Sequence, residues 1–318
     1  MLDMRRLRIF EAVATTGSFQ SAAQELSYTG PAISHHIAKL EQEVGAKLIS
    51  RRGPGPNLTA AGELLLGRSR AILASVADTE RALAELAGRG TVVRVGAFAT
   101  ASASFVTEAI VELGREQPGI TISLVDGEPD ETIERLHRRE IDIGLAFDSA
   151  ESTLAEADDQ LDLDYLGDDP LVLAMAADHP LATQPALGIG DFADEAWIEG
   201  ARGDSQISLI LQAACARACF EPRIAFNSGN IQVMLRMVAA RVGVALIPRI
   251  ALHGDQQGLA VRELDEPRPA RRIVLVMRRS GERSQPLEAV AATLRAQAGD
   301  WLDHPSHRRG LASVTSAS

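Results

Sequence analysis

The chain has 318 residues, of which 46% are hydrophobic and 24% charged, and it carries a formal net charge of −11 at pH 7. This composition is ordinary for a soluble globular protein, and the length allows two or three domains. No apolar run approaches the roughly eighteen residues that a membrane-spanning helix needs, and the charged N-terminus lacks the apolar core of a signal peptide. A membrane protein is therefore excluded, and a cytoplasmic location is expected.

The charge is unevenly distributed along the sequence. Residues 1–58 contain seven Lys/Arg and five Asp/Glu, a net charge of +2, which leaves −13 for the rest of the chain. A small N-terminal domain can therefore meet DNA phosphates, while the acidic remainder limits loose association with nucleic acid.

Three helices are predicted near the N-terminus. The first has an apolar face of Leu7, Phe10 and Val13 and ends at Thr16-Gly17. Ser18 is expected to cap a short second helix, whose inward-facing residues are Phe19, Ala22, Ala23 and Leu26. A four-residue turn, 27–30, leads into the third helix. Two short helices joined by such a turn make a helix-turn-helix unit.

The third helix has one apolar face and one polar face. Its apolar stripe consists of Ile33, Ile37, Leu40 and Val44 at helical spacing. Thr29 is expected at the N-cap, and Pro31 lies in the first turn, where its missing N–H does no harm. Small, polar and basic residues opposite the stripe suit a helix that enters a DNA groove; the alternative is an ordinary surface helix. The candidate DNA contacts here are Ser18, Thr29, Pro31, Ala32, Ser34, His35, His36 and Lys39.

A short hairpin is predicted after the third helix, over residues 48–59. It contains Arg51, Arg52 and a tip rich in Gly and Pro. A basic hairpin of this kind is a wing that can lie along phosphates or reach a minor groove. Arg51 and Arg52 therefore join the candidate DNA contacts, and residues 1–58 are assigned to a winged helix-turn-helix domain.

A long helix is predicted over residues 59–88, followed by a glycine-containing hinge. Its apolar residues follow a 3.5-residue spacing, with Ser69 as the weak position. Such a seam normally pairs with another subunit, although packing against its own domain is the alternative. The candidate dimerisation residues are Leu65, Ile72, Val76, Leu83 and Leu86, and residues 59–90 are assigned to the linker helix and hinge.

Strands and helices alternate from Thr91 onward. The predicted strands are 92–97, 120–125, 141–147, 171–176, 197–199, 244–248 and 272–277, and the predicted helices are 103–116, 130–139, 207–220, 230–241 and 285–298. This alternation implies βαβ units, a mainly parallel sheet and an α/β domain of two halves around a cleft. We assign subdomain I to about 91–161 and 268–303, subdomain II to about 162–267, and a disordered tail to 304–318.

Two further features are interpreted without a bound metal. Residues 151–169 hold eight acidic residues and no basic ones, but Leu163 occupies the position where a calcium loop needs Gly, so a solvated acidic loop is predicted. Cys215 and Cys219 lie one helical turn apart with no further ligands nearby in sequence, so buried thiols are favoured over a redox switch. No metal and no cofactor are expected.

The N-terminal motifs resemble those of LysR-type transcriptional regulators. The resemblance rests on residues 12–23, 31–34, 40–41, 45 and 58–62, with family-like spacing throughout. One position departs from the pattern, because Gly30 stands where the family usually carries Gln at the start of the recognition helix. The resemblance implies a winged helix-turn-helix, a periplasmic-binding-protein-like effector domain, dimers formed through the linker helix, and tetramers formed through the effector domains.

Small polar residues near predicted helix N-termini form the candidate effector site. In open α/β sheets, ligands bind beyond the carboxyl ends of strands, where free backbone N–H groups favour negative charge. The same hydroxyl groups can cap helices, so capping alone is the alternative. A small anionic effector is favoured over a cationic one, and the candidate residues are Phe98, Thr100, Ser102, Arg202, Ser205, Ser228 and Asn230.

The sequence carries no recognisable catalytic motif: G-x-S-x-G, P-loop and HExxH patterns are absent, and residues 188–193 match G-x-G-x-x-A outside its strand context. We therefore predict an effector-responsive regulator that recognises a pseudo-palindromic operator, and not an enzyme. Its expected partners are double-stranded DNA, a small-molecule effector, RNA polymerase, and copies of itself in a homodimer or homotetramer. The alternative, supported only by Gly30, is a small-molecule-binding or catalytic α/β protein with a vestigial DNA-binding domain.

Overall fold

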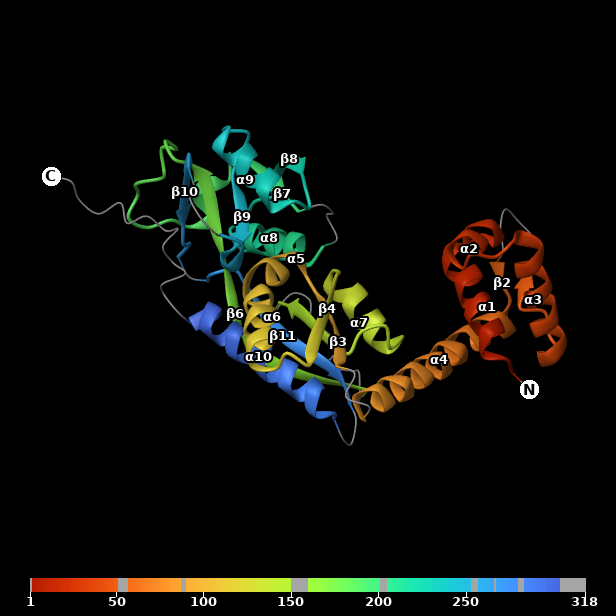
Figure 1. The fold of residues 1–318 in the computed structure, drawn as a ribbon. Helices are drawn as coiled ribbons and strands as arrows, with labels where there is room; N and C mark the ends of the chain where they lie inside the picture. The colour runs from red at the N-terminus through yellow and green to blue at the C-terminus, as the bar shows by residue number, and fades with distance from the viewer. Residues whose placement is uncertain are drawn as a thin grey trace. The chain divides into compact units, whose positions relative to one another are not determined.

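The computed structural model describes residues 2–50, 57–86, 90–149, 160–200, 205–252, 257–265, 267–279 and 283–303, except for the side chains of 78, 81, 82 and 84–86 (Figure 1). The chain divides into two compact units, the first built on Met1–Thr91 and the second on most of the residues from Val92 onward. No helix in the described part of the chain is long and apolar enough to cross a membrane. The tail predicted at 304–318 lies outside the described residues.

The first unit contains the helices and the hairpin that the sequence predicts. Ser18 caps the second helix as expected, because its Oγ accepts the backbone N–H groups of Gln20 and Ser21. Thr29 stands at the N-cap of the third helix but makes no capping hydrogen bond with its side chain. The elements are α1 (Met4–Thr16), α2 (Phe19–Glu25), α3 (Gly30–Val44), β1 (Ile49–Ser50), β2 (Asn57–Leu58) and α4 (Ala60–Leu86).

The core of the first unit explains how α3 is oriented. Ile33, Ile37 and Leu40 are buried, as the helical spacing predicts, and they pack with apolar residues of α1, α2 and the base of the hairpin. Burial of an apolar side chain stabilises the fold by roughly 1.5–3 kcal/mol, so this stripe fixes the rotation of the helix. The opposite face of α3 is consequently turned toward solvent.

The second unit contains nine strands and several helices among the described residues (Figure 1). The strands are β3 (Thr91–Ala97), β4 (Ile120–Asp126), β5 (Ile143–Asp148), β6 (Leu161–Ala176), β7 (Ala196–Glu199), β8 (Arg223–Asn227), β9 (Ala245–Pro248), β10 (Leu259–Arg262) and β11 (Ala270–Arg278). The helices are α5 (Ala99–Ala101), the π-helical turn η1 (Ser102–Val106), α6 (Thr107–Glu116), α7 (Pro129–His137), α8 (Gln206–Arg217), α9 (Ile231–Ala239) and α10 (Gln285–Asp303), with 3₁₀ turns η2 (Ile189–Phe192) and η3 (Arg249–Ala251). The sequence pattern missed β8 and β10.

The main sheet is mixed, which corrects the predicted mainly parallel sheet. Its order is β10-β6-β11-β5-β3-β4, and β9 also pairs with β6. Strands β3 and β5 are parallel, but β11 is antiparallel to both β5 and β6, and β6 is antiparallel to β9 and β10. A helical crossover between two strands of one sheet produces parallel neighbours, as for β3 and β5, whereas β11 runs antiparallel to both of its neighbours, β5 and β6. The alternation of strands and helices in the sequence does not show which strands pair antiparallel.

Strand β6 runs through both halves of the second unit. Its first part pairs with β11, and its last residues pair with β9 and β10. In the first half, α6 and α10 pack with the apolar core of β3, β5 and β11, while α7 covers a separate cluster. In the second half, α8 and α9 pack against two clusters of apolar residues from β6, β7 and β9. The candidate effector loops therefore extend from two separately packed cores.

The first part of β6 corrects the predicted solvated acidic loop. Residues 161–169 form a strand, whereas residues 150–159 lie outside the described part of the chain. The carboxylates of this strand are held by arginines that follow it in the sequence by more than a hundred residues. Asp162 contacts Arg279 at 2.9 Å and Arg283 at 2.6 Å, and Asp164 contacts Arg295. Composition alone suggested solvation because these partners are distant in sequence.

Candidate DNA-binding and effector sites

The exposed face of α3 carries most of the predicted DNA contacts. Pro31, Ser34, His35 and Lys39 are exposed, and Ala32 is half-buried. Thr29 is exposed at the start of the helix, and Ser18 is half-buried at the start of α2. These side chains offer hydroxyl and imidazole groups that can hydrogen-bond base edges and a cation that can meet a phosphate.

His36 takes part in a small cluster that the sequence did not reveal. Its ring meets the ring of Tyr28 edge to face, with centroids 5.8 Å apart. Arg5 lies beside the same tyrosine, donating from Nε to the hydroxyl at 2.5 Å. Burial lowers the pKa of His36, and the positive charges of Arg5, His35 and Arg6 lower it further. His36 is therefore predominantly neutral at pH 7 and packs between α1 and the turn before α3.

Gly30 leaves an open position at the start of α3. A Cβ placed on this residue would meet no heavy atom within 4 Å, and its backbone is not in the left-handed region. A longer side chain can therefore be accommodated there without strain on the fold. The departure from the family pattern removes a contact group and leaves the shape of the helix-turn-helix intact.

Glu41 connects α3 to the base of the wing. Its carboxylate is buried and accepts the backbone N–H of Leu48 at 3.0 Å and that of Ile49 at 3.3 Å. Lys47 contacts the other carboxylate oxygen at 2.5 Å. Burial opposes ionisation, but these donors outweigh it and lower the pKa of Glu41. The wing arginines Arg51 and Arg52 lie outside the described residues, so their contacts stay predictions.

The predicted seam of α4 is largely uncovered in a single chain. Ile72 is 40% exposed and Leu83 is 60% exposed, whereas Leu65 and Val76 are half-buried. Helix α1 instead covers the neighbouring side of α4, where Ser69 and Leu73 are buried. The side chain of Leu86 lies outside the described residues.

The candidate effector loop after β3 is built on a buried arginine that the sequence reading missed. Arg271 on β11 is 2% exposed and donates from Nη2 to the hydroxyl of Thr100 at 2.7 Å. It also donates from Nε to Asp169 on β6 at 2.9 Å. The Cζ atom lies 4.7 Å from the ring centroid of Phe98 and 4.5 Å from that of Phe147. Phe98 is itself buried and serves this loop as an aromatic support for the guanidinium.

Ser102 is held by β4, whereas Thr100 is held by Arg271 of β11. Its hydroxyl donates to Asp126 at the end of β4, with an oxygen–oxygen distance of 3.0 Å. The loops after β3 and β4 are joined by the bond from Gly127 N to the Ala97 carbonyl, at 3.0 Å. Ser102 also begins the π-helical turn, a feature that often occurs at functional sites.

The second half contributes helix caps to the site. Ser205 caps α8 by accepting the N–H of Ser208, and Asn230 caps α9 by accepting the N–H groups of Gln232 and Val233. Ser228 accepts the N–H of Asn230 at 3.2 Å. Arg202 lies outside the described residues. The N-terminal turn of α8 approaches the first half through Ile207, which packs against the cores of both halves.

The two cysteines differ in environment. Cys215 is on the buried face of α8, and burial raises the pKa of its thiol to about 12. Cys219 is exposed, so the predicted pair of buried thiols is correct for Cys215 only. A thiol with such a high pKa is almost entirely protonated at neutral pH and reacts slowly. Among the described residues, no group of three or more metal-binding side chains is present.

Together, these features define a winged helix-turn-helix regulator that carries an α/β ligand-binding unit. The model of the bacterial regulatory helix-turn-helix protein, lysR family, matches residues 4–63, and that of the LysR substrate binding domain matches residues 87–299. The chain belongs to the LysR family of transcriptional regulators, with a DNA-binding helix-turn-helix and an effector-binding domain. The alternative of a vestigial DNA-binding domain is not favoured.

Relatives and solved structures agree with this assignment. The chain is 31% identical to the uncharacterized HTH-type transcriptional regulator YvbU of Bacillus subtilis (strain 168), covering 83% of this chain and 88% of that protein. It is 28% identical to the regulator AlsR of the same organism, covering 83% and 86%. The crystal structure of CbnR, a LysR family transcriptional regulator, has a TM-score of 0.66 at 22% identity, covering 93% of this chain and 99% of that chain.

Proposed function

We propose that the protein binds a pseudo-palindromic DNA operator, with α3 in the major groove and the wing along the backbone. The observation that carries this proposal is the exposed Ser34, His35 and Lys39 face, directly opposite the buried stripe of α3. CbnR, whose fold is similar, has been crystallised with its target DNA. Two copies of α3 related by a two-fold axis would read two half-sites, which accounts for operator symmetry.

The test is a gel shift against the DNA upstream of the protein's own gene, repeated at several salt concentrations. Arg51→Ala and Arg52→Ala should each weaken binding to every sequence and reduce the salt slope by about one unit per lost phosphate contact. His35→Ala should instead change which base pairs are preferred. A salt slope that survives the double arginine variant would contradict the wing assignment.

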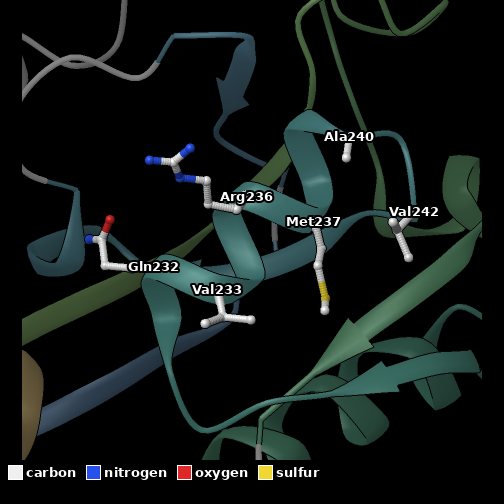
Figure 2. A pocket seen from close by; sticks show the side chains of 6 residues that line it. All are labelled: Gln232, Val233, Arg236, Met237, Ala240 and Val242. Carbon is white, nitrogen blue, oxygen red and sulfur yellow. The ribbon is translucent and has the colours of Figure 1, made fainter.

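We infer a homodimer built on α4, and a tetramer formed when second units pair. One exposed surface of the second unit is a groove of about 410 Å³ along α9 (Figure 2). Val233 and Met237 point to the same side of α9 and Val242 follows the helix, while the guanidinium of Arg236 extends to the opposite side in this view; all four residues line the groove. Val233 is 39% exposed and Val242 is 42% exposed, so the single chain leaves apolar area uncovered.

A second copy of the same unit supplies a surface of suitable charge. Helix α6 exposes Val111 among the carboxylates of Glu108, Glu112 and Glu116, with Arg115 beside them. The basic, partly apolar α9 surface of one copy therefore complements the acidic α6 surface of another, and a two-fold axis would use both contacts twice. Arg236→Glu should reduce the tetramer fraction in sedimentation, and adding Glu108→Arg should restore it. If the double variant forms no more tetramer than Arg236→Glu alone, this pairing of α9 with α6 is contradicted.

We further propose that a small polar effector with an anionic group binds between the two halves of the second unit. Thr100, Ser102, Ser205, Ser228 and Asn230 lie at or just before the starts of helices in the two halves. The effector must favour one arrangement of the oligomer over another, or it would shift nothing. A coupling of roughly 1–3 kcal/mol, about 5- to 150-fold in DNA affinity, is typical.

The family to which the chain belongs consists of regulators, and we propose that this protein has no catalytic role and acts in the cytoplasm, with RNA polymerase as a further partner. A thermal-shift screen of metabolites on the full chain tests the effector proposal. A stabilising compound should lose its effect in Thr100→Val. A compound whose effect survives that substitution would place the effector elsewhere.

A further inference from the structure

Lysine is rare in this chain and confined to the DNA-binding unit. The 32 cationic side chains comprise 30 arginines and two lysines, Lys39 and Lys47. A guanidinium stays protonated, whereas a lysine amine can lose its proton and accept an acyl group. A reagent that transfers acyl groups to side-chain amines therefore finds both of its targets in the first unit, one on α3 and one just before β1.

Lys39 presents its amine to solvent. It lies on the exposed face of α3, and no residue in the described part of the chain forms a hydrogen bond or an ion pair with its side chain. Glu43, the carboxylate one turn further along the helix, is engaged by Arg6 of α1 instead. No contact among the described residues therefore has to break before Lys39 reacts.

Lys47 differs from Lys39 because a buried carboxylate holds its amine. Its Nζ lies 2.5 Å from Oε2 of Glu41, whose side chain is 9% exposed. The same carboxylate accepts the backbone N–H groups of Leu48 and Ile49. Acylation of Lys47 would remove the cation beside a buried carboxylate, which costs free energy. The two lysines are thus unequal targets, and Lys39 should react first.

Acylation of Lys39 would change how α3 meets DNA. The reaction replaces a positive ammonium with a neutral amide and lengthens the side chain by an acyl group. Lys39 lies on the same exposed face as Ser34 and His35, so the lost charge removes a contact to phosphate. Residues 1–58 carry a net charge of only +2, and one lost cation halves it. Bound DNA would in turn cover the amine, so DNA and an acyl donor compete for one side chain.

We propose that Lys39 is a modification site, at which an acyl phosphate transfers its acyl group to the side-chain amine and so weakens DNA binding. The nitrogen lone pair of the neutral amine attacks the acyl carbon, and a C–N bond forms. The C–O bond to phosphate breaks, and its electron pair leaves with inorganic phosphate while the nitrogen releases a proton to water. This inference rests on the proposed docking of α3 on DNA, and it adds a chemical control of that contact.

The test treats the full chain with acetyl phosphate and follows the acetylation of each lysine by tandem mass spectrometry. Lys39 should be acetylated roughly 5-fold faster than Lys47 or more, the ratio that corresponds to about 1 kcal/mol for an ion pair with an exposed partner. A duplex DNA fragment at low salt should slow the reaction of Lys39. Equal rates at the two lysines, including no reaction at either, or a Lys39 rate that DNA does not change, would contradict the proposal.

Variants connect the modification to DNA binding. At treatment times that acetylate Lys39 alone, acetyl phosphate should lower the DNA affinity of the parent and of the control Lys47→Arg, and it should leave that of Lys39→Arg at its untreated value. Lys39→Gln, which lacks the charge, should reduce the salt slope of binding by about one unit. A treated Lys39→Arg protein that loses affinity as the parent does would overturn the assignment.

The same measurements separate two levels of failure. A shallower salt slope in Lys39→Gln, without acetylation of Lys39 in the parent, would refute the modification site and leave the docking of α3 standing. Acetylation of Lys39 together with an unchanged slope in Lys39→Gln would instead contradict the docking and, with it, the effect of acetylation on DNA binding. Circular dichroism of each variant verifies that the chain is folded.

Discussion

Asp169 and Arg271 face each other in register across β6 and β11, and both side chains are buried. Their bond lies where β6 passes from its pairing with β11 to its pairing with β9. Asp169 also accepts the backbone N–H of Ile250 in the second half at 3.1 Å, while Arg271 donates to Thr100 in the first half. The ion pair therefore joins both halves of the second unit at the candidate effector site.

Removing one member of this pair should be costly. Asp169→Ala leaves the Arg271 guanidinium buried without its counter-ion, and we expect the free energy of unfolding to fall by about 3–5 kcal/mol. Urea denaturation followed by circular dichroism measures this change. Asp178→Ala is the matched control, because Asp178 pairs with Arg241 and the two side chains are 58% and 69% exposed, and it should cost at most about 1 kcal/mol. Similar losses in the two variants would show that burial does not govern the contribution of Asp169.

Gly30 offers a test of the one departure from the family pattern. Gly30→Gln introduces a side chain into open space at the start of α3, and helix propensity favours Gln over Gly by several tenths of a kcal/mol. We expect a thermal midpoint equal to or slightly above that of the parent, and tighter binding to the operator in a gel shift because a polar group is restored near the groove. Unchanged affinity would show that this position does not contact DNA.

Gly62 provides the control for that substitution. A Cβ on Gly62 would lie 2.2 Å from the Leu48 carbonyl oxygen, a backbone atom that cannot move aside easily. Gly62→Ala should therefore lower the thermal midpoint of the first unit, whereas Gly30→Ala should not. Equal midpoints for the two alanine variants would contradict the contrast in packing between these glycines.

The sequence predicted the structure well where the spacing of apolar residues matched the period of a single helix. Ile33, Ile37 and Leu40 are buried because a helix places them on one side, and the same spacing predicts the exposed Ser34 and His35 face. Long-range pairing was not visible in this way. The first part of β6 has the composition of a solvated loop, and its partners Arg279, Arg283 and Arg295 lie after β11 and on α10.

Arg271 illustrates the same limit in the candidate effector site. Thr100 could be proposed from its place after a predicted strand, but its partner is 171 residues away in the chain. Arg271 precedes the predicted strand 272–277, and nothing in the local sequence shows that its side chain will be buried against two aromatic rings. The polarity of the site depends on that contact, so it could not be derived from the sequence.

Glu41 should make the stability of the first unit depend on acid. Its pKa is lowered in the folded protein, so its contribution is fully present above the ordinary value of 4.5 and is lost as the pH falls through the lower folded value. Glu41→Gln should cost about 1–3 kcal/mol near neutral pH, because two backbone N–H groups lose a charged acceptor. The difference between parent and variant should shrink as the pH falls below 4.5 and through the lower folded pKa. Urea denaturation at several pH values measures it, and a constant difference would exclude this role for the carboxylate.

The seam of α4 gives the last prediction. Leu83 is 60% exposed in a single chain and lies on the same helical face as Leu65, so a partner helix would bury it. Leu83→Glu would place a charge in that buried contact, at a cost of several kcal/mol, and should shift the sedimenting species toward smaller assemblies. Operator binding should weaken with it, since two linked recognition helices bind more tightly than one. Ser75→Glu is the matched control, because Ser75 is exposed on a different side of α4, and it should sediment as the parent does. If Leu83→Glu also sediments like the parent, the α4 seam does not hold the subunits together.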